Sequence, residues 1–98
     1  MATSTVVEPS LVGTPSTVAS SATNQVLLVA NAARRGATVY NDSTATLYWL
    51  NANAAATNAI YSVAIVAGGY YEIPYNYCGP VNGIWASANG NARIVEHT

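Results

Sequence analysis

Short runs of β-prone residues alternate with turn-forming residues from residue 25 onward. Each run has four to seven residues and is rich in Val, Ile, Leu, Tyr or Trp, a composition that favours strands. The sequence therefore predicts seven strands, over Gln25–Ala30, Ala37–Asn41, Thr46–Leu50, Ile60–Val66, Tyr70–Ile73, Val81–Ala86 and Ala92–Glu96. Because Asn-Gly is a strong hairpin signal, Asn89-Gly90 predicts that the last two of these strands pair antiparallel.

No segment has the pattern of a helix. The Ala-rich stretches Ala30–Ala33 and Ala52–Ala56 are short, are interrupted by Asn and lack an apolar stripe at helical spacing. We expect each to be a loop or a single turn. Strands spaced about ten residues apart, with no room for crossover helices, predict an all-β fold: a small antiparallel β-sandwich or barrel of about seven strands.

Residues 1–24 differ from the rest of the chain. Ten of them are Ser or Thr, two are Pro, none is aromatic and only Glu8 is charged. Such a segment favours extended backbone and has too little apolar surface to fold alone. We therefore predict an extended N-terminal arm over residues 1–24 and an antiparallel β domain over residues 25–98. A neighbouring subunit is the expected holder of the arm, but pairing of the arm with its own sheet stays open.

The chain is short and carries few charges. Its 98 residues suit one domain, and its net charge is −1. The charged residues number seven, and Lys is absent: Glu8, Arg34, Arg35, Asp42, Glu72, Arg93 and Glu96. Three cations give no basic surface for nucleic acid or anionic lipid. The low charge has two explanations. In the first, the chain is an ordinary small domain whose surface is made polar by neutral Asn, Thr and Ser. In the second, which the seven Tyr and two Trp favour, other subunits cover much of the surface.

Few residues are suited to catalysis or to holding a metal. His97, the single histidine, lies next to the C-terminal residue, where a general base is hard to position, and a triad would need it together with Asp42. Cys78 cannot form an intrachain disulfide and is expected to be a small apolar residue in a turn. We predict no catalytic residues, no metal site and no cofactor. With no secretory signal or membrane-length apolar run, the chain is expected to be made in a cytoplasm.

The aromatic residues gather in one part of the sequence. Five fall within sixteen residues, interleaved with Pro and Asn: Tyr70, Tyr71, Tyr75, Tyr77 and Trp85. This mixture suits stacking on sugar rings, but strand alternation favours a different arrangement, with Tyr71 and Ile73 in the core and Tyr70 and Glu72 facing a subunit contact.

The Arg34-Arg35 pair has two predicted uses. Its guanidinium groups suit pairing with Glu72 or Glu96 of this chain, or with carboxylates of a partner, and a surface pair of this kind would serve orientation. Together with the aromatic cluster, this predicts an interface formed by Arg34, Arg35, Tyr70, Tyr75, Tyr77 and Trp85.

Several motifs resemble a known family. The ordered series RGATVYNDSTATLY from Arg35, AGGYYEIP from Ala67, GIWA from Gly83 and GNARIVE from Gly90 is similar to small virion proteins of tailed bacteriophages and prophages. The resemblance covers roughly residues 25 to 97. Cys78 departs from the pattern, in which Thr or another small polar residue is expected before Gly79.

The resemblance implies a non-enzymatic structural protein of a phage particle, located in the virion. The first expectation is a capsid decoration or cement protein at the capsid surface, a homotrimer or dimer that binds the major capsid protein and copies of itself. The alternative is a tail, baseplate or fibre-associated module whose Tyr and Trp surface binds a host glycan or another tail protein. Neither expectation includes nucleic acid, a membrane or a small-molecule ligand.

Overall fold

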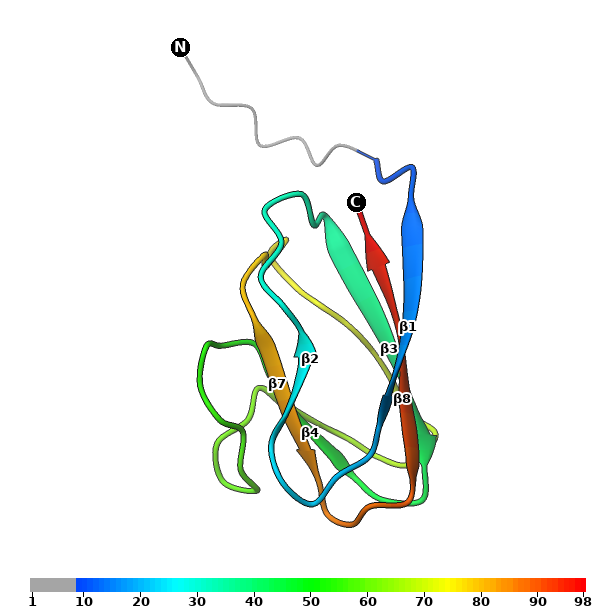
Figure 1. Ribbon diagram of the computed structural model, residues 1–98, viewed down its shortest axis with the longest axis vertical. Coiled ribbons are helices and arrows are strands. Elements are labelled where there is room, and N and C mark those ends of the chain that lie inside the picture. The colour runs from blue at the N-terminus through cyan, green and yellow to red at the C-terminus, as the bar shows by residue number, and fades with distance from the viewer. Residues whose placement is uncertain (1–8) are drawn as a thin grey trace.

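The computed structural model of the protein describes residues 9–98 and contains two stacked antiparallel sheets (Figure 1). Sheet A has the strand order β1-β8-β3-β6, and sheet B has the order β2-β7-β4-β5. The strands are β1 (Gly13–Ala19), β2 (Gln25–Leu28), β3 (Gly36–Ser43), β4 (Leu47–Leu50), β5 (Val63–Ile65), β6 (Tyr70–Glu72), β7 (Val81–Trp85) and β8 (Gly90–His97). The predicted all-β fold is confirmed, and of the two predicted architectures the structure has the sandwich.

All seven strands predicted from the sequence are present, and the Ala-rich stretches contain no helix. The eighth strand, β1, lies inside the predicted arm. It pairs with β8 of the same chain along its whole length, from Gly13 opposite His97 to Ala19 opposite Asn91. Within the described residues, the first strand of the sandwich therefore begins at Gly13 rather than at residue 25. A Ser- and Thr-rich segment can form this strand because an edge strand needs backbone hydrogen bonds more than apolar side chains. Residues 1–8 of the predicted arm lie outside the part of the chain that the structure describes.

The predicted hairpin around Asn89-Gly90 is wrong. β7 belongs to sheet B, whereas β8 lies between β1 and β3 in sheet A. Gly90 has a φ of 123° and sits opposite Ser43 at the end of β3, and the Asn89 carbonyl accepts a hydrogen bond from the Thr44 N–H. The Asn-Gly pair therefore turns the chain from one sheet to the other, where its backbone freedom is equally useful.

The core lies between the sheets and follows the two-residue period of the strands. In sheet A the inward residues are Ala37 and Val39 of β3 and Ala92 and Ile94 of β8. In sheet B they are mainly Leu47 and Trp49 of β4 and Val81, Gly83 and Trp85 of β7. Gly83 leaves the space that the Leu27 side chain fills. Alternation of this kind puts the intervening residues on the two outer faces.

The chain changes sheet at almost every connection. Among the connections that the structure describes between β1 and β8, only β4–β5 stays within one sheet. The connections β1–β2, β3–β4, β5–β6 and β7–β8 cross at the lower end of the sandwich in Figure 1, and β2–β3 and β6–β7 cross at the upper end. Each crossing carries backbone polar groups past the edge of the core, and these groups need hydrogen-bond partners.

Asn41, which is fully buried, supplies those partners at the lower end. Its amide nitrogen donates to the carbonyls of Ala45, Ile65 and Val66 at 2.8, 2.8 and 3.1 Å. Its amide oxygen accepts from the Ser43 hydroxyl at 2.7 Å and from the Trp85 indole N–H at 3.2 Å. The Asn41 side chain therefore connects β3 of sheet A with the β3–β4 turn, with the end of β5 and with β7. Since β5 and β7 belong to sheet B, it joins the two sheets.

Replacing Asn41 should lower the stability of the whole sandwich. The Asn41→Ala variant removes the partner of the Trp85 indole N–H and of the Ile65 carbonyl, and each such buried group costs about 1–3 kcal/mol. The Ala45 and Val66 carbonyls keep their hydrogen bonds from the Ser43 hydroxyl and the Gly69 N–H. We expect the free energy of unfolding to fall by about 2–4 kcal/mol, measured by urea denaturation. Asn53→Ala, at an exposed position, is the matched control and should change it by less than about 0.5 kcal/mol. Equal stability of the two variants would contradict this role.

Candidate functional site

The outer face of sheet A carries a row of aromatic and cationic side chains. The strand register places Tyr70 of β6 opposite Tyr40 of β3, Tyr40 opposite Arg93 of β8, and Arg93 opposite Thr17 of β1. Directly opposed residues in antiparallel strands point to the same face. Tyr70 is 62 % exposed, and Tyr40 is 43 % exposed. We call Tyr40, Tyr70 and Arg93, with the carboxylates of Asp42 and Glu72, the sheet A patch.

Hydrogen bonds fix the polar ends of this patch. The Arg93 guanidinium Nε donates to the Asp42 carboxylate at 2.7 Å, and both side chains are about half exposed. The Tyr70 hydroxyl donates to the Glu72 carboxylate at 3.2 Å. Loss of solvation raises the pKa of Tyr70 above its ordinary value, and the hydrogen bond and negative charge of Glu72 raise it further. The Tyr70 ring is thus held through its hydroxyl, and both tyrosine side chains of the patch are exposed.

Arg34 is buried and does not lie on a surface. Its guanidinium donates to the Glu96 carboxylate at 2.7 Å and to the carbonyls of Val29, Tyr77 and Gly79. The predicted pairing of the Arg34-Arg35 segment with Glu96 is confirmed, but the pair is internal. The prediction of Arg34 as a contact residue is therefore wrong, because its donors join the β2–β3 and β6–β7 crossings to β8.

Trp85 is also in the core rather than in an interface. It is 2 % exposed, on the inner face of β7, and donates its indole N–H to Asn41. Tyr77 is half-buried against the core and donates its hydroxyl to the Pro80 carbonyl at 2.6 Å. Arg35, also half-buried, donates to the Pro9 carbonyl. Of the six predicted interface residues, Tyr70 and Tyr75 have the most exposed side chains.

The predicted alternation along β6 is confirmed. Tyr71 packs against the core in a T-shaped contact with Trp49, the ring centroids 5.9 Å apart, and the next inward residue, Ile73, is buried. Tyr70 and Glu72 face outward. The two neighbouring tyrosines therefore belong to different surroundings, with Tyr70 in the sheet A patch and Tyr71 between the core and a cavity.

A cavity of about 410 Å³ lies beside Tyr71, between the start of the β4–β5 connection and the β6–β7 connection. Its lining is aromatic and uncharged: Asn51, Ser62, Tyr71, Pro74, Tyr75 and Tyr77. The Asn51 amide nitrogen donates to the Tyr71 hydroxyl at 3.0 Å. Tyr75 is 99 % exposed and has a φ of 60°, a conformation that is rare for a bulky residue. We call this the tyrosine cavity.

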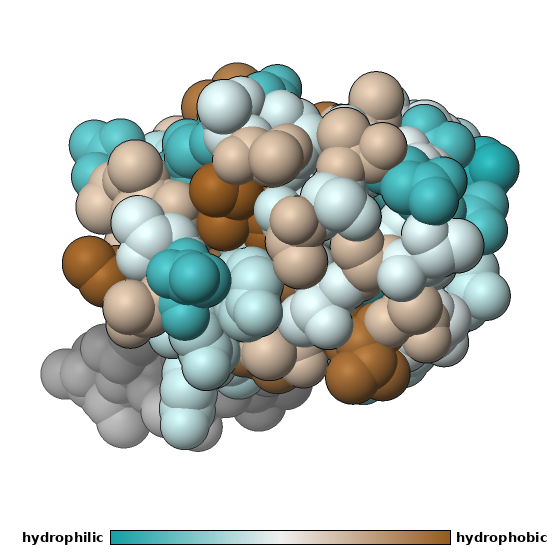
Figure 2. Space-filling model, turned by 90° about the horizontal axis from the view of Figure 1, so that it is seen from below, coloured by the Kyte–Doolittle hydropathy of each residue, from teal (hydrophilic) through white to brown (hydrophobic). Residues whose placement is uncertain are grey.

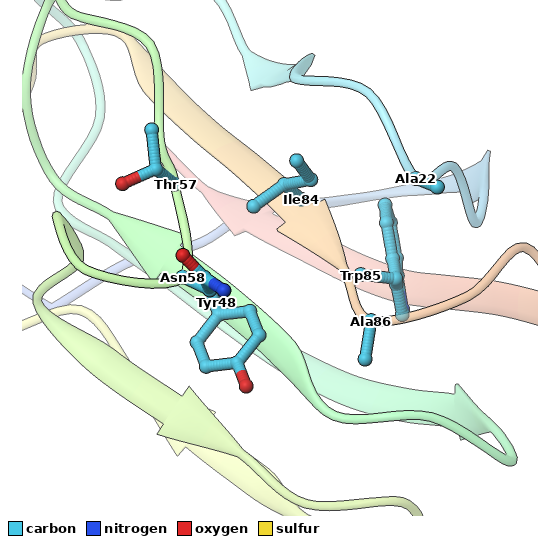
Figure 3. A pocket seen from close by; sticks show the side chains of 7 residues that line it. All are labelled: Ala22, Tyr48, Thr57, Asn58, Ile84, Trp85 and Ala86. Carbon is cyan, nitrogen blue, oxygen red and sulfur yellow. The ribbon is translucent and has the colours of Figure 1, made fainter.

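A second cavity, of about 380 Å³, lies on the outer face of sheet B (Figure 3). Thr57 and Asn58 of the β4–β5 connection lie over it, and Tyr48 of β4 and Ile84 of β7 line its floor. The remaining lining residues are Ala22, Trp85 and Ala86. Its walls carry hydroxyl and amide groups but no carboxylate, amine or guanidinium. It therefore suits small neutral groups.

The structure separates the residues that a triad would need. His97 is opposite Gly36 at one end of β3, and Asp42 is near the other end, six positions along the strand. At about 3.4 Å per residue, they lie roughly 20 Å apart. The Cys78 thiol donates to the Arg34 carbonyl at 3.0 Å. Within residues 9–98, no cluster of three His, Cys, Asp or Glu side chains is placed to bind a metal ion.

Sequence reasoning missed Tyr40, Arg93, Asn51 and Ser62 as site residues. The outward direction of Tyr40 could have been found, since it alternates with the apolar Val39 within a predicted strand. The pairing of Tyr40 with Tyr70 and Arg93 could not, because it depends on which strands are neighbours. Asn51 and Ser62 meet at the cavity only because the long β4–β5 connection folds back, where the Ser62 hydroxyl accepts from the Asn51 N–H.

No family model, curated protein or solved structure matches the chain. Within the described part of the chain, residues 9–98, there is no helix of the length and apolarity that crossing a membrane requires.

The contact between Tyr70 and Glu72 makes a prediction about titration. Because both the hydrogen bond and the charge of Glu72 raise the pKa of Tyr70, Glu72→Ala should lower that pKa toward the ordinary tyrosine value. The pKa of Tyr70 is thus higher in the folded chain than in the unfolded chain. The protonated hydroxyl therefore stabilises the fold at pH values below the unfolded-state pKa, and this stabilisation is lost as the pH rises through the folded-state pKa. The pKa of Tyr70 is measured by following its ring resonances by NMR during alkaline titration.

The Glu72→Gln variant is the control for this titration. It keeps a hydrogen-bond acceptor but removes the charge, so the pKa of Tyr70 should fall between those of the native chain and Glu72→Ala. An unchanged pKa of Tyr70 in Glu72→Ala would show that the carboxylate does not act on this hydroxyl.

Proposed function

We propose that the protein is a non-enzymatic structural component of a phage particle, a decoration or cement protein that binds the major capsid protein through the sheet A patch. The observation that carries the proposal is the row of Tyr70, Tyr40 and Arg93 across an exposed sheet face. Tyr and Arg are over-represented among the residues that dominate binding energy at protein interfaces. The motif resemblance to small virion proteins supplies the kind of particle.

The electrostatics of the chain support attachment to another protein. Arg34 and Glu96 neutralise each other in the interior, and Arg93 and Asp42 do so on the patch. When a partner covers the sheet A patch, the charges that lose water are therefore mainly Glu72 and the Arg93–Asp42 ion pair. Few free charges of this kind are typical of the centre of a protein interface. At the end of the sandwich seen in Figure 2, most of the surface is likewise of intermediate hydropathy, neither strongly hydrophilic nor strongly hydrophobic.

Attachment to empty heads tests the proposal. Heads from the phage or prophage that encodes the chain are mixed with purified protein, and bound protein is measured after sedimentation. Tyr40→Ala should weaken attachment by about tenfold or more, because loss of a central interface tyrosine costs at least about 1.4 kcal/mol. The Tyr40 side chain is on an outer face, so the variant should keep the circular dichroism spectrum of the native chain.

Tyr61→Ala is the matched control. Tyr61 is 42 % exposed, almost as much as Tyr40, but its ring lies beside Tyr48 of sheet B at 5.0 Å. This variant should attach as the native chain does. Native protein that binds no heads would overturn the capsid proposal, and equal weakening by both variants would overturn the assignment to sheet A.

The tyrosine cavity favours a second candidate function. Exposed aromatic rings beside amide and hydroxyl groups, without charge, suit the stacking and hydrogen bonding that neutral sugars require. The Tyr71 hydroxyl accepts from Asn51, so its own proton is directed elsewhere and can be donated to a sugar oxygen. On this alternative the chain is a tail, baseplate or fibre-associated module that binds a host glycan.

Tyr75 is the residue that tests this alternative. Neutral oligosaccharides of glucose, galactose and N-acetylglucosamine are titrated into labelled protein and followed by NMR. Binding at the cavity should shift the Tyr71 and Tyr77 resonances, and Tyr75→Ala should weaken it by about two- to tenfold, since a stacked aromatic contributes roughly 0.5–1.5 kcal/mol. Tyr70→Ala, outside the cavity, should bind normally. Absence of shifts with every sugar, together with normal host adsorption of Tyr75→Ala particles, would reject the glycan function.

A further inference from the structure

The attachment of β1 to the sandwich is almost entirely through its backbone. Six of its seven residues are exposed, and only Val18 packs against the core. Its Cα register with β8 is continuous over all seven residues. Since backbone groups are the same in every copy of the chain, β8 of another copy offers β1 the same partners.

The two apolar residues just before β1 are uncovered in the single chain. Leu11 is 92 % exposed and Val12 is 55 % exposed, although the N–H groups of both donate to the Thr98 carbonyl. A contact with another molecule along this segment would remove the apolar surface of both side chains from water. No residue of β1 itself is charged, so approach of this strand to a second copy meets no charge repulsion.

The segment that joins β1 to β2 is suited to act as a hinge. It consists of Ser20, Ser21, Ala22, Thr23 and Asn24 and contains no proline. The two residues of this segment that come directly after β1 are hydrogen-bonded to the sandwich. The Ser20 N–H donates to the Gly90 carbonyl, and the Ser21 carbonyl accepts from the Trp85 N–H. Ala22 and Thr23 are exposed. Reversal of the chain at these two residues would move β1 together with Ser20 and Ser21 and would leave β2 in place. The contacts of Val18 with the core and of Ser21 with Trp85 are then made by the same segment of the other copy.

We propose that β1 is an exchangeable strand, which pairs with β8 of a neighbouring copy of this chain when copies are held close together. The β1–β8 contacts are the same within one chain and between two, so the balance depends on the local concentration of copies. Neighbours in an assembly face one another at effective concentrations in the millimolar range, about those of a short flexible linker. The inference deepens the proposed assembly function, on which it rests for the presence of such neighbours.

Cysteine cross-linking between two variants tests the exchange. Because the Ser20 N–H donates to Gly90, the adjacent Ala19–Asn91 pair occupies a non-hydrogen-bonded site, with Cα atoms about 4.5 Å apart, which a disulfide can bridge. Ala19→Cys and Asn91→Cys are made in separate chains, each with Cys78→Ser. The chains are unfolded together, refolded as an equimolar mixture at about 1 mM, oxidised and separated by mass.

Exchange predicts a covalent dimer of the two different variants, several-fold more abundant than in a control mixture in which Ser87→Cys replaces Asn91→Cys. Ser87 is exposed and lies outside the β1–β8 register. The dimer should decline on refolding at about 1 µM, where pairing within one chain prevails. Equal dimer yields from the two mixtures at the higher concentration would overturn the proposal.

A second pair covers the case in which one variant fails to fold. Thr17→Cys with Arg93→Cys occupies the next non-hydrogen-bonded pair and should give the same cross-link. The assay contains no phage heads, so its outcome is separate from that of the attachment experiment. Failed cross-linking with normal head attachment rejects strand exchange alone, and cross-linking without head attachment rejects the capsid function alone.

Discussion

The fold depends on one buried amide. Six connections pass between the sheets, and several of them bring backbone carbonyls to the lower edge of the core, where water cannot reach them. Asn41 satisfies three of these carbonyls and, through its oxygen, the indole of Trp85. Its own backbone N–H and carbonyl pair with Gly69 and Gly68. A small sandwich with many crossings needs such a residue, because an unpartnered buried polar group costs as much as a good apolar contact contributes.

The opposite end of the sandwich is held by a buried charge in place of an amide. Arg34 joins the β2–β3 and β6–β7 crossings to Glu96 of β8, and the Asn31 amide donates to the second oxygen of the same carboxylate. The few charges of the chain are thus used largely inside it or in the Arg93–Asp42 pair. Apart from this pair and Glu72, the outer faces of the two sheets carry mainly neutral groups. This connects the low charge seen in the sequence with a surface suited to contacts between proteins.

The sequence was sufficient for the strands but not for their partners. Local composition located seven strands, and alternation placed Tyr70 outward and Tyr71 inward, because both are properties of consecutive residues. The Asn-Gly pair misled, since the same positive-φ freedom serves a hairpin or a crossing between sheets. Arg34 and Trp85 were misplaced for a similar reason: whether a polar tip finds partners inside depends on which distant carbonyls or amides meet it. The β1 strand was hidden because edge strands carry little apolar signal.

The number of copies in the particle decides most directly whether the chain is an assembly subunit of the capsid. Quantitative mass spectrometry of purified particles, with the major capsid protein as the internal standard, gives this number. A decoration protein that repeats with the symmetry of the head should be present in roughly hundreds of copies, in a fixed ratio to the capsid protein. A content of a few tens or fewer, as in a tail ring or fibre, would contradict the account.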